Sequence, residues 1–282
     1  MNTLNAPIIH PTDFSDLSRS AFAHALRISL AAKCKLYIAH IADRKDAKEW
    51  QAFPHVRQTL ARWGLLDAGA STADIFDKLG VEVAKVEIGS HDPVRGLSRF
   101  LAGHPSELMV LATRGRDGLP RWVEPSVAEA MARQAQTQTL FIPEHSAGFV
   151  NQAGGELRLK RILVPVDHSP APVPAIRAIQ QFCRVLGAAP EIRILHIGAN
   201  VPVVATVSTP SHGAPIEVPI EVRGGNIVEG ILQAAAEMQA NLIGMATAGH
   251  RGLLDAIRGS TTERVLRRAP CPVLAIPVGN PP

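Results

Sequence analysis

Residues 8–13 read IIHPTD, and residues 162–167 read ILVPVD. Each stretch is a short apolar run that ends in Pro-x-Asp. An amphipathic pattern follows each run, with apolar residues spaced as on one face of a helix. A buried strand followed by a helix is therefore predicted in both places. A segment that recurs in this way indicates an internal repeat.

The rest of the chain follows the same order twice. The remaining predicted elements are second strands at 36–41 and 192–197, third strands at 81–88 and 217–222, helices at 92–101 and 227–238, fourth strands at 108–113 and 242–247, and last strands at 139–143 and 272–277. The offset between the copies is 154 residues at Asp13 and Asp167 but 134 residues at Pro143 and Pro277. The second copy has therefore lost about twenty residues between its second and third strands.

Alternating strands and helices predict right-handed βαβ units and a parallel sheet covered on both faces. We expect an α/β protein of two similar doubly wound domains, at 1–143 and 161–282, with a Gly-containing interdomain linker at 144–160. The interval 46–79 of the first copy predicts one or two helices. The interval 198–215 of the second copy predicts a loop or an extended segment, placed where a lid would lie.

The composition limits the class of protein. Hydrophobic residues make up 46% of the chain, which supports a large core, and aromatic residues only 4%, which disfavours a surface that stacks bases. The formal charge is +4 and no basic patch requires nucleic acid. Three isolated cysteines indicate packing residues rather than disulfides or a zinc site. With neither a signal-like N-terminus nor a long apolar run, we expect a cytoplasmic protein without membrane contact.

The most informative segment reads ATAGHRG at residues 246–252 and continues with GSTTE at residues 259–263. A glycine-bearing turn leaves a strand, and a Gly-Ser pair then opens a helix, where free N–H groups attract anions. This arrangement predicts a phosphate site at the carboxyl end of the sheet. An alternative needs no ligand: Ser260-x-x-Glu263 is also a helix-capping box, and Ser126-x-x-Glu129 repeats it in the first copy.

Together with the upstream Pro-x-Asp, this segment resembles the G-x2-G-x9-G-[ST] motif of the universal stress protein family. The resemblance covers nearly the whole chain twice, as in a tandem member. It implies a five-stranded parallel sheet in each domain, of the adenine nucleotide alpha hydrolase-like or flavodoxin-like three-layer type, and dimer-like pairing of the two domains. It also implies ATP, with or without Mg²⁺, whose nucleoside lies between the first-strand Asp and the second-strand end. The phosphates would lie on the glycine loop.

Carried over to the second copy, the resemblance implies a nucleotide site. Its residues are Pro165, Val166, Asp167, Ile197, Met245, Ala246, Gly249, Gly259, Ser260, Thr261 and Thr262. One position departs from the family pattern, because Ala246 stands in place of the first glycine. Arg251 and Arg258 flank this loop, either as phosphate contacts or as solvated side chains.

The first copy departs further, and we expect its site to be degenerate. The residues that it keeps at matching positions are Pro11, Thr12, Asp13, Ile41, Gly115, Gly118 and Ser126, and Ala112 again stands in place of the first glycine. Pro125 replaces the glycine before Ser126, and proline has no N–H to donate to a phosphate. Asp13 and Asp167 are alternatively simple helix N-terminal carboxylates.

Other residues bear on catalysis and metal binding. His40 and His196 recur at equivalent strand positions and are expected to be partly buried and hydrogen-bonded rather than metal ligands. No Ser-His-Asp or Cys-His arrangement has supporting spacing. We therefore expect no enzyme with fast turnover, although slow ATP hydrolysis stays open.

The leading hypothesis is a nucleotide-responsive stress protein, a sensor or adaptor that binds an adenine nucleotide in the second domain. A rival hypothesis is a nucleotide-free structural module on which partner proteins dock, and a weak ATPase ranks third. Pairing of the two domains within one chain would give a monomer, and a homodimer of tandem chains is equally open.

Overall fold

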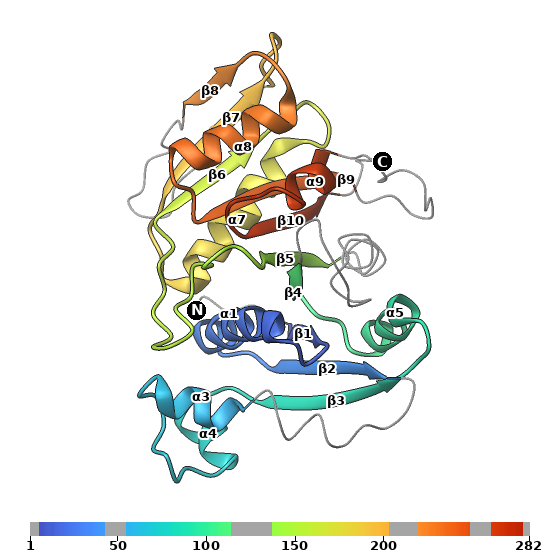
Figure 1. Ribbon diagram of the computed structural model, residues 1–282, viewed down its shortest axis with the longest axis vertical. Helices are drawn as coiled ribbons and strands as arrows, with labels where there is room; N and C mark the ends of the chain where they lie inside the picture. Colours follow the sequence, from blue (N-terminus) through green and yellow to red (C-terminus); the bar gives the residue numbers. More distant parts are fainter. Residues whose placement is uncertain (1–5, 43–54, 114–136, 203–218, 249–260, 279–282) are drawn as a thin grey trace.

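The computed structural model describes residues 6–42, 55–113, 137–202, 219–248 and 261–278 (Figure 1). In these residues ten strands form one continuous sheet in the order β3-β2-β1-β4-β5-β10-β9-β6-β7-β8. The strands are β1 (Ile8–Thr12), β2 (Leu36–Ala42), β3 (Val83–Gly89), β4 (Leu108–Thr113), β5 (Gln138–Pro143), β6 (Arg161–Pro165), β7 (Glu191–Ile197), β8 (Ile220–Arg223), β9 (Leu242–Ala248) and β10 (Val273–Val278). The helices are α1 (Asp16–Ala32), α3 (Val56–Arg62), α4 (Ala73–Leu79), α5 (Pro93–Gly103), α7 (Pro172–Leu186), α8 (Ile227–Glu237) and α9 (Thr261–Leu266).

Each half of the sheet has five strands, and all pairings within a half are parallel. This confirms the predicted α/β class and its repeat. In both halves the order is third, second, first, fourth, fifth strand. That is the order of the first five strands of the classic doubly wound dinucleotide-binding sheet, whereas a flavodoxin-like sheet would run second, first, third, fourth, fifth. Of the two variants expected, the strand order therefore favours the adenine nucleotide alpha hydrolase-like one.

The two halves join through their fifth strands. β5 pairs with β10 in antiparallel register, with Leu140 opposite Leu274, Thr139 opposite Ala275 and Phe141 opposite Val273. Leu140 and Leu274 are equivalent positions of the repeat, because they differ by the same 134 residues as the two last-strand prolines. The seam therefore has the symmetry of a two-fold dimer built into one chain, as the resemblance implied.

The core continues across this seam on both faces of the sheet. Against one face pack α1 and α7, and a single cluster of buried side chains includes Leu26 and Leu140 from one half and Ile176 and Leu274 from the other. The opposite face holds a second cluster beneath α5, α8 and α9. The two halves therefore share their hydrophobic layers instead of burying separate cores.

Most predicted elements lie within a few residues of the observed ones. The interval 46–79 contains two described helices, α3 and α4, beside the first half (Figure 1). The third strand of the second half begins at Ile220 instead of residue 217. The residues 203–215 of the predicted lid segment lie outside the described residues. The three cysteines are free; Cys183 and Cys271 are buried and Cys34 is partly buried, which agrees with packing roles.

The segment at 144–160 does more than connect the halves, because it folds into a small hairpin. Val150 forms an antiparallel bridge with Leu157, and the N–H of Arg158 donates to the carbonyl of Phe149 at 2.7 Å. Phe149 and Val150 are fully buried. Its glycines predicted an irregular linker, but its apolar residues complete the core beneath α1 and α7.

A single histidine of α1 anchors this hairpin. The backbone N–H groups of Phe149 and Val150 both donate to Nε2 of His24, at 3.0 and 3.2 Å. Gly148 precedes them with φ at +69°, and a Cβ there would lie 2.3 Å from the imidazole ring. Glycine is required at this position for both its conformation and its size.

The first prediction concerns Gly148. Gly148→Ala should lower the free energy of unfolding by about 2–4 kcal/mol, because it combines a left-handed backbone with a clash against His24. Gly64 is a matched control, since it has the same φ of +69° but no atom within 4 Å of the point that a Cβ would occupy. Gly64→Ala should cost only about 1 kcal/mol. Equal losses in urea unfolding would show that the His24 contact adds nothing.

Two buried histidines must stay neutral in the folded chain. His24 donates from Nδ1 to the carbonyl of Ser20 at 2.7 Å, so its Nε2 is free to accept only while unprotonated. His10 is fully buried and donates from Nδ1 to the carbonyl of Val110 at 2.9 Å. Burial lowers the pKa of each imidazole from 6.5 to about 4.

The second prediction follows from these lowered pKa values. Between pH 6.5 and about pH 4 the unfolded chain binds protons that the folded chain does not, so acid should destabilise the fold. Each lowered pKa corresponds to a decrease of about 3 kcal/mol in the free energy of unfolding between neutral pH and about pH 4. His10→Val copies Val164, the equivalent residue of the second copy, and should remove about half of this decline. Urea unfolding of both proteins at pH 7, 5.5 and 4.5 measures it; parallel pH profiles would contradict the assignment to His10.

Candidate functional site

The strand order reverses its direction once in each half. In open α/β sheets, ligands bind outside the carboxyl ends of strands, where the strand order reverses direction. That point lies between β1 and β4 in the first half and between β6 and β9 in the second. Leu163 of β6 lies opposite Ile243 of β9, so the residues that follow these strands emerge at the same edge. Of the predicted site residues, Pro11 and Thr12 end β1, Pro165 ends β6, and Ala112 and Ala246 lie near the ends of β4 and β9.

In the second half, the Pro-x-Asp motif ends β6. Pro165 is the last residue of the strand, and the N–H of Val166 extends the ladder by donating to the carbonyl of Leu195 at 2.8 Å. Val166 is buried and Asp167 is exposed. The strand pairing therefore fixes the backbone of the motif, and the carboxylate of Asp167 lies in solvent at the end of the strand.

Neighbouring strands bring further predicted residues to this edge. Ile197 is the last residue of β7, and Met245 and Ala246 lie in the carboxyl-terminal part of β9. Thr261 and Thr262 open the described part of α9. The remaining predicted phosphate contacts lie outside the described residues: Gly249, Gly259 and Ser260.

The first half places its predicted residues in the same way. Pro11 and Thr12 end β1 and are buried, with Asp13 directly after them. Ile41 lies near the end of β2, and Ala112 near the end of β4. Gly115 and Ser126, with the intervening Pro125, lie outside the described residues.

The two motif carboxylates have different surroundings. Oδ1 of Asp13 accepts from the N–H and the hydroxyl of Ser15, at 3.0 and 2.6 Å, and from the hydroxyl of Ser18 at 2.7 Å. Ser15 is the N-cap of α1, so Asp13 organises the turn that starts this helix. Asp167 accepts only the N–H of His168 among the described contacts, at 2.8 Å. The helix-terminal role considered for both residues therefore fits Oδ1 of Asp13, whose Oδ2 is buried without a partner among the described residues, while Asp167 is exposed.

The two repeated histidines make the same contact in both halves. His40 donates from Nδ1 to the carbonyl of Thr12 at 2.8 Å, and His196 donates to the carbonyl of Val166 at 3.1 Å. Both rings are buried, which confirms the predicted role. Each ring thus ties the end of the first strand to the second strand. Nε2 of His196 is left as a buried acceptor without a partner among the described residues.

A second repeated contact was missed in the sequence. A Cβ on Gly96 of α5 would lie 3.2 Å from Ile41, and a Cβ on Gly230 of α8 would lie 2.5 Å from Ile197. The two glycines differ by 134 residues, the offset of the last strands. Each lets a helix approach the isoleucine at the end of the second strand. Alignment of the two copies at this offset would have revealed the pair.

The residue after the motif aspartate differs between the copies. Phe14 lies over His40, with ring centroids 4.2 Å apart. His168 takes the equivalent place in the second half, is exposed, and stands edge-on to His196 at 6.2 Å. Nε2 of His168 donates to the carbonyl of Asn200 at 3.0 Å. The residue after the motif aspartate is therefore aromatic and apolar in the first half and polar in the second, a difference that the motif comparison did not bring out.

The basic residues near the end of the chain are partly neutralised. Arg267, directly after α9, pairs with Glu263 of that helix, and Arg268 forms a two-bond pair with Glu229 of α8, at 2.5 and 2.9 Å. Within the described ranges, no three His, Cys, Asp or Glu side chains are grouped to hold a metal ion. No helix in the described part of the chain has both the length and the apolar character needed to cross a bilayer.

The strand order and the helices thus define an α/β protein with two repeats of a doubly wound parallel sheet. The universal stress protein family matches residues 5–143 and 203–277. The chain belongs to this family, and the tandem arrangement predicted from the repeat agrees with the match.

Solved structures show the same fold over both halves. A universal stress protein from Archaeoglobus fulgidus is similar over 96% of this chain and 98% of its own, with 19% identity and a TM-score of 0.61. A functionally unknown protein from Pseudomonas aeruginosa PAO1 is similar over 96% and 92%, with 15% identity and a TM-score of 0.57. A universal stress protein in complex with cAMP matches 49% of this chain and 96% of its own, with 23% identity and a TM-score of 0.31. Comparison with curated proteins gave no match.

The third prediction tests the difference between the two carboxylates. Asp13→Ala removes three accepted hydrogen bonds and should lower the free energy of unfolding by about 2 kcal/mol. Asp167→Ala at the equivalent exposed position should change it by less than about 0.5 kcal/mol. Thermal and urea unfolding of the two variants measure this difference. A larger loss for Asp167→Ala would mean that its carboxylate supports the fold and is not held ready for a ligand.

Proposed function

We propose that the protein binds an adenine nucleotide, ATP, in the crevice of the second half and acts as a nucleotide-responsive sensor or adaptor in a stress response. The observation that carries this proposal is the exposed Asp167 carboxylate at the strand-order reversal between β6 and β9, followed in sequence by the Gly249 and Gly259-Ser260 pattern.

The nucleoside end of the crevice offers hydrogen-bond acceptors. Asp167 presents a carboxylate with one described contact, and His196 has a buried acceptor nitrogen without a described partner. Ribose hydroxyls and the amino group of adenine are donors that suit such acceptors. Ile197, held against Gly230, supplies an apolar side chain beside them. This combination of apolar surface and a few polar groups is typical of small-molecule sites.

The phosphate end is supported by the sequence. Glycines allow backbone N–H groups to approach an anion, and Ser260, Thr261 and Thr262 add hydroxyl donors. Mg²⁺ would be held mainly by the phosphates themselves and by water. The first copy has Pro125 where the second has Gly259, so we propose one working site and one degenerate site.

The proposed role is binding and signalling and not rapid catalysis. The rival role, a nucleotide-free module that docks partner proteins, is favoured by Ala246, whose methyl group stands where the family motif has a glycine. Slow ATP hydrolysis ranks third. Direct measurement of nucleotide binding separates the first two roles.

The fourth prediction is that purified protein binds ATP with Mg²⁺ at one site per chain. Mass spectrometry of the denatured preparation detects nucleotide that was carried along, and calorimetry of the emptied protein measures affinity. Gly259→Asp places a carboxylate against the phosphates and should weaken binding at least about tenfold, or 1.4 kcal/mol. Asp167→Ala should weaken ATP and adenosine alike.

The matched control is Pro125→Asp, the equivalent position of the first copy, which should bind ATP as the unmodified protein does. No heat and no carried nucleotide in the unmodified protein would reject the proposed function in favour of the docking module. Equal loss in Pro125→Asp and Gly259→Asp would place the site in both halves.

A further inference from the structure

Fusion of the two halves leaves two outer strands in the described sheet. β5 and β10 pair with each other, so the outer strands are β3 in the first half and β8 in the second (Figure 1). An outer strand presents backbone N–H and C=O groups that can pair with another chain. The two outer strands differ in the residues that they offer.

The backbone direction of β8 is known from one hydrogen bond. The N–H of Gly198 donates to the carbonyl of Arg223 at 2.9 Å, so Arg223 faces inward to the end of β7. Backbone groups of successive residues in a strand point to opposite sides. The N–H and C=O of Val222 therefore point away from the sheet, at the outer side of the strand.

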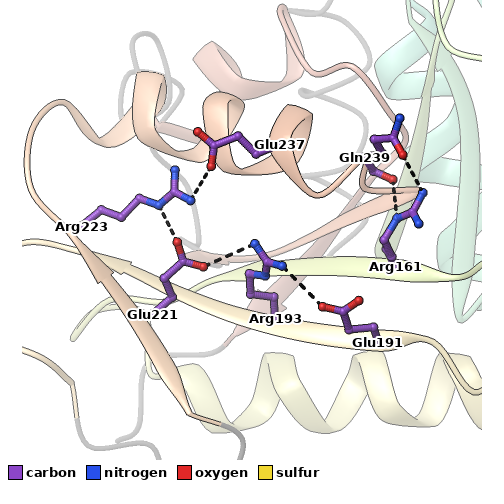
Figure 2. Close-up of polar contacts among 7 residues, drawn as sticks. All are labelled: Arg161, Glu191, Arg193, Glu221, Arg223, Glu237 and Gln239. Carbon is purple, nitrogen blue, oxygen red and sulfur yellow. Dashed lines mark hydrogen bonds and ion pairs between the residues drawn. The ribbon is translucent and has the colours of Figure 1, made fainter.

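The charged side chains of β8 are held over one face of the sheet. Arg223 pairs with Glu221 and with Glu237 of α8, at 2.6 Å each, and Arg193 lies 3.6 Å from Glu221 (Figure 2). Charges on an edge strand usually hinder pairing with another chain. Here opposite charges neutralise one another along the strand, so this hindrance is reduced.

The residue of β8 between these two charges, Val222, is apolar. Val222 is 49% exposed, and Ile227 at the start of α8 is 41% exposed. By the strand register, Val222 opposite His196 corresponds to Glu87 opposite His40 on the other outer strand. Glu87 is an exposed charge near the end of β3, of the kind that protects an edge strand. Of the two outer strands in the described sheet, β8 thus has an apolar residue at the position where β3 has a charge.

We propose that β8 pairs in antiparallel fashion with β8 of a second copy of this chain, about a two-fold axis at Val222. The two valines then form a hydrogen-bonded pair that exchanges both N–H···O=C bonds. Glu221 lies opposite the partner's Arg223, and Arg223 lies opposite the partner's Glu221. Opposite charges in directly facing positions stabilise such a pair. The sequence of β8 is thus self-complementary, which favours a second copy over an unrelated strand.

The fifth prediction is the oligomeric state of designed variants. Small interfaces associate weakly, so the full chain is examined by analytical ultracentrifugation from about 1 µM to about 300 µM. The unmodified protein should shift from monomer to dimer over this range. Val222→Pro removes the outward N–H without removing a bond inside the sheet, so it should stay folded and monomeric. Glu87→Pro, the equivalent change on the opposite edge, should dimerise as the unmodified protein does.

Val222→Lys provides a second test that keeps every backbone donor, and it should also abolish the dimer by facing two charges across the axis. Thermal unfolding establishes that each variant is folded. A monomer at every concentration, a dimer that survives both Val222 variants, or a dimer lost in Glu87→Pro would overturn the proposal. Nucleotide binding by these variants is measured in parallel, so this outcome stays separate from that for the second-half site.

Discussion

The antiparallel pairing of β5 with β10 is the constraint on which the rest of the molecule depends. It sets Leu140 against Leu274 and joins two parallel half-sheets into one sheet with shared hydrophobic layers. Because the pairing is antiparallel, the carboxyl ends of the two sets of strands point in opposite directions. The two crevices therefore open at opposite ends of the sheet, and no single nucleotide can bridge them. The seam also uses up one edge of each half, which leaves β3 and β8 as the outer strands.

The two halves share the contacts that position their strand ends, and they differ in the side chains that follow those ends. The histidine bonds to the first-strand carbonyls recur, as do the isoleucines packed against helical glycines. These contacts position strand ends, so both halves need them. Asp13 is used by its own turn, whereas Asp167 is exposed, and Phe14 is replaced by His168. Both halves of the duplicated chain therefore have the same strand ends, but the side chains directly after the first strand differ between them.

Sequence reasoning predicted the repeat, the class of fold and most of the element bounds, because buried parallel strands such as β4 are continuous apolar runs. The sequence did not predict the hairpin at 144–160, because a glycine such as Gly148 is equally compatible with an irregular linker and with a packed turn. The distinction lies in the contact of Gly148 with His24, more than a hundred residues away in sequence. The different uses of Asp13 and Asp167 were missed for a similar reason, because the same motif precedes turns with different hydrogen-bond partners.

The amino-acid sequence by itself determined that this is a duplicated α/β chain with a Pro-x-Asp strand end in each copy and a Gly-Ser step in the second. Those features are local, and apolar periodicity and glycine spacing report them directly. Only the tertiary structure decided that the copies share one sheet and that His10 and His24 are buried neutral groups. It also decided which carboxylate faces solvent and which backbone groups of β8 point outward. These properties depend on contacts between residues that are distant in the sequence, and the pairing of β5 with β10 brings the two halves together to form one sheet.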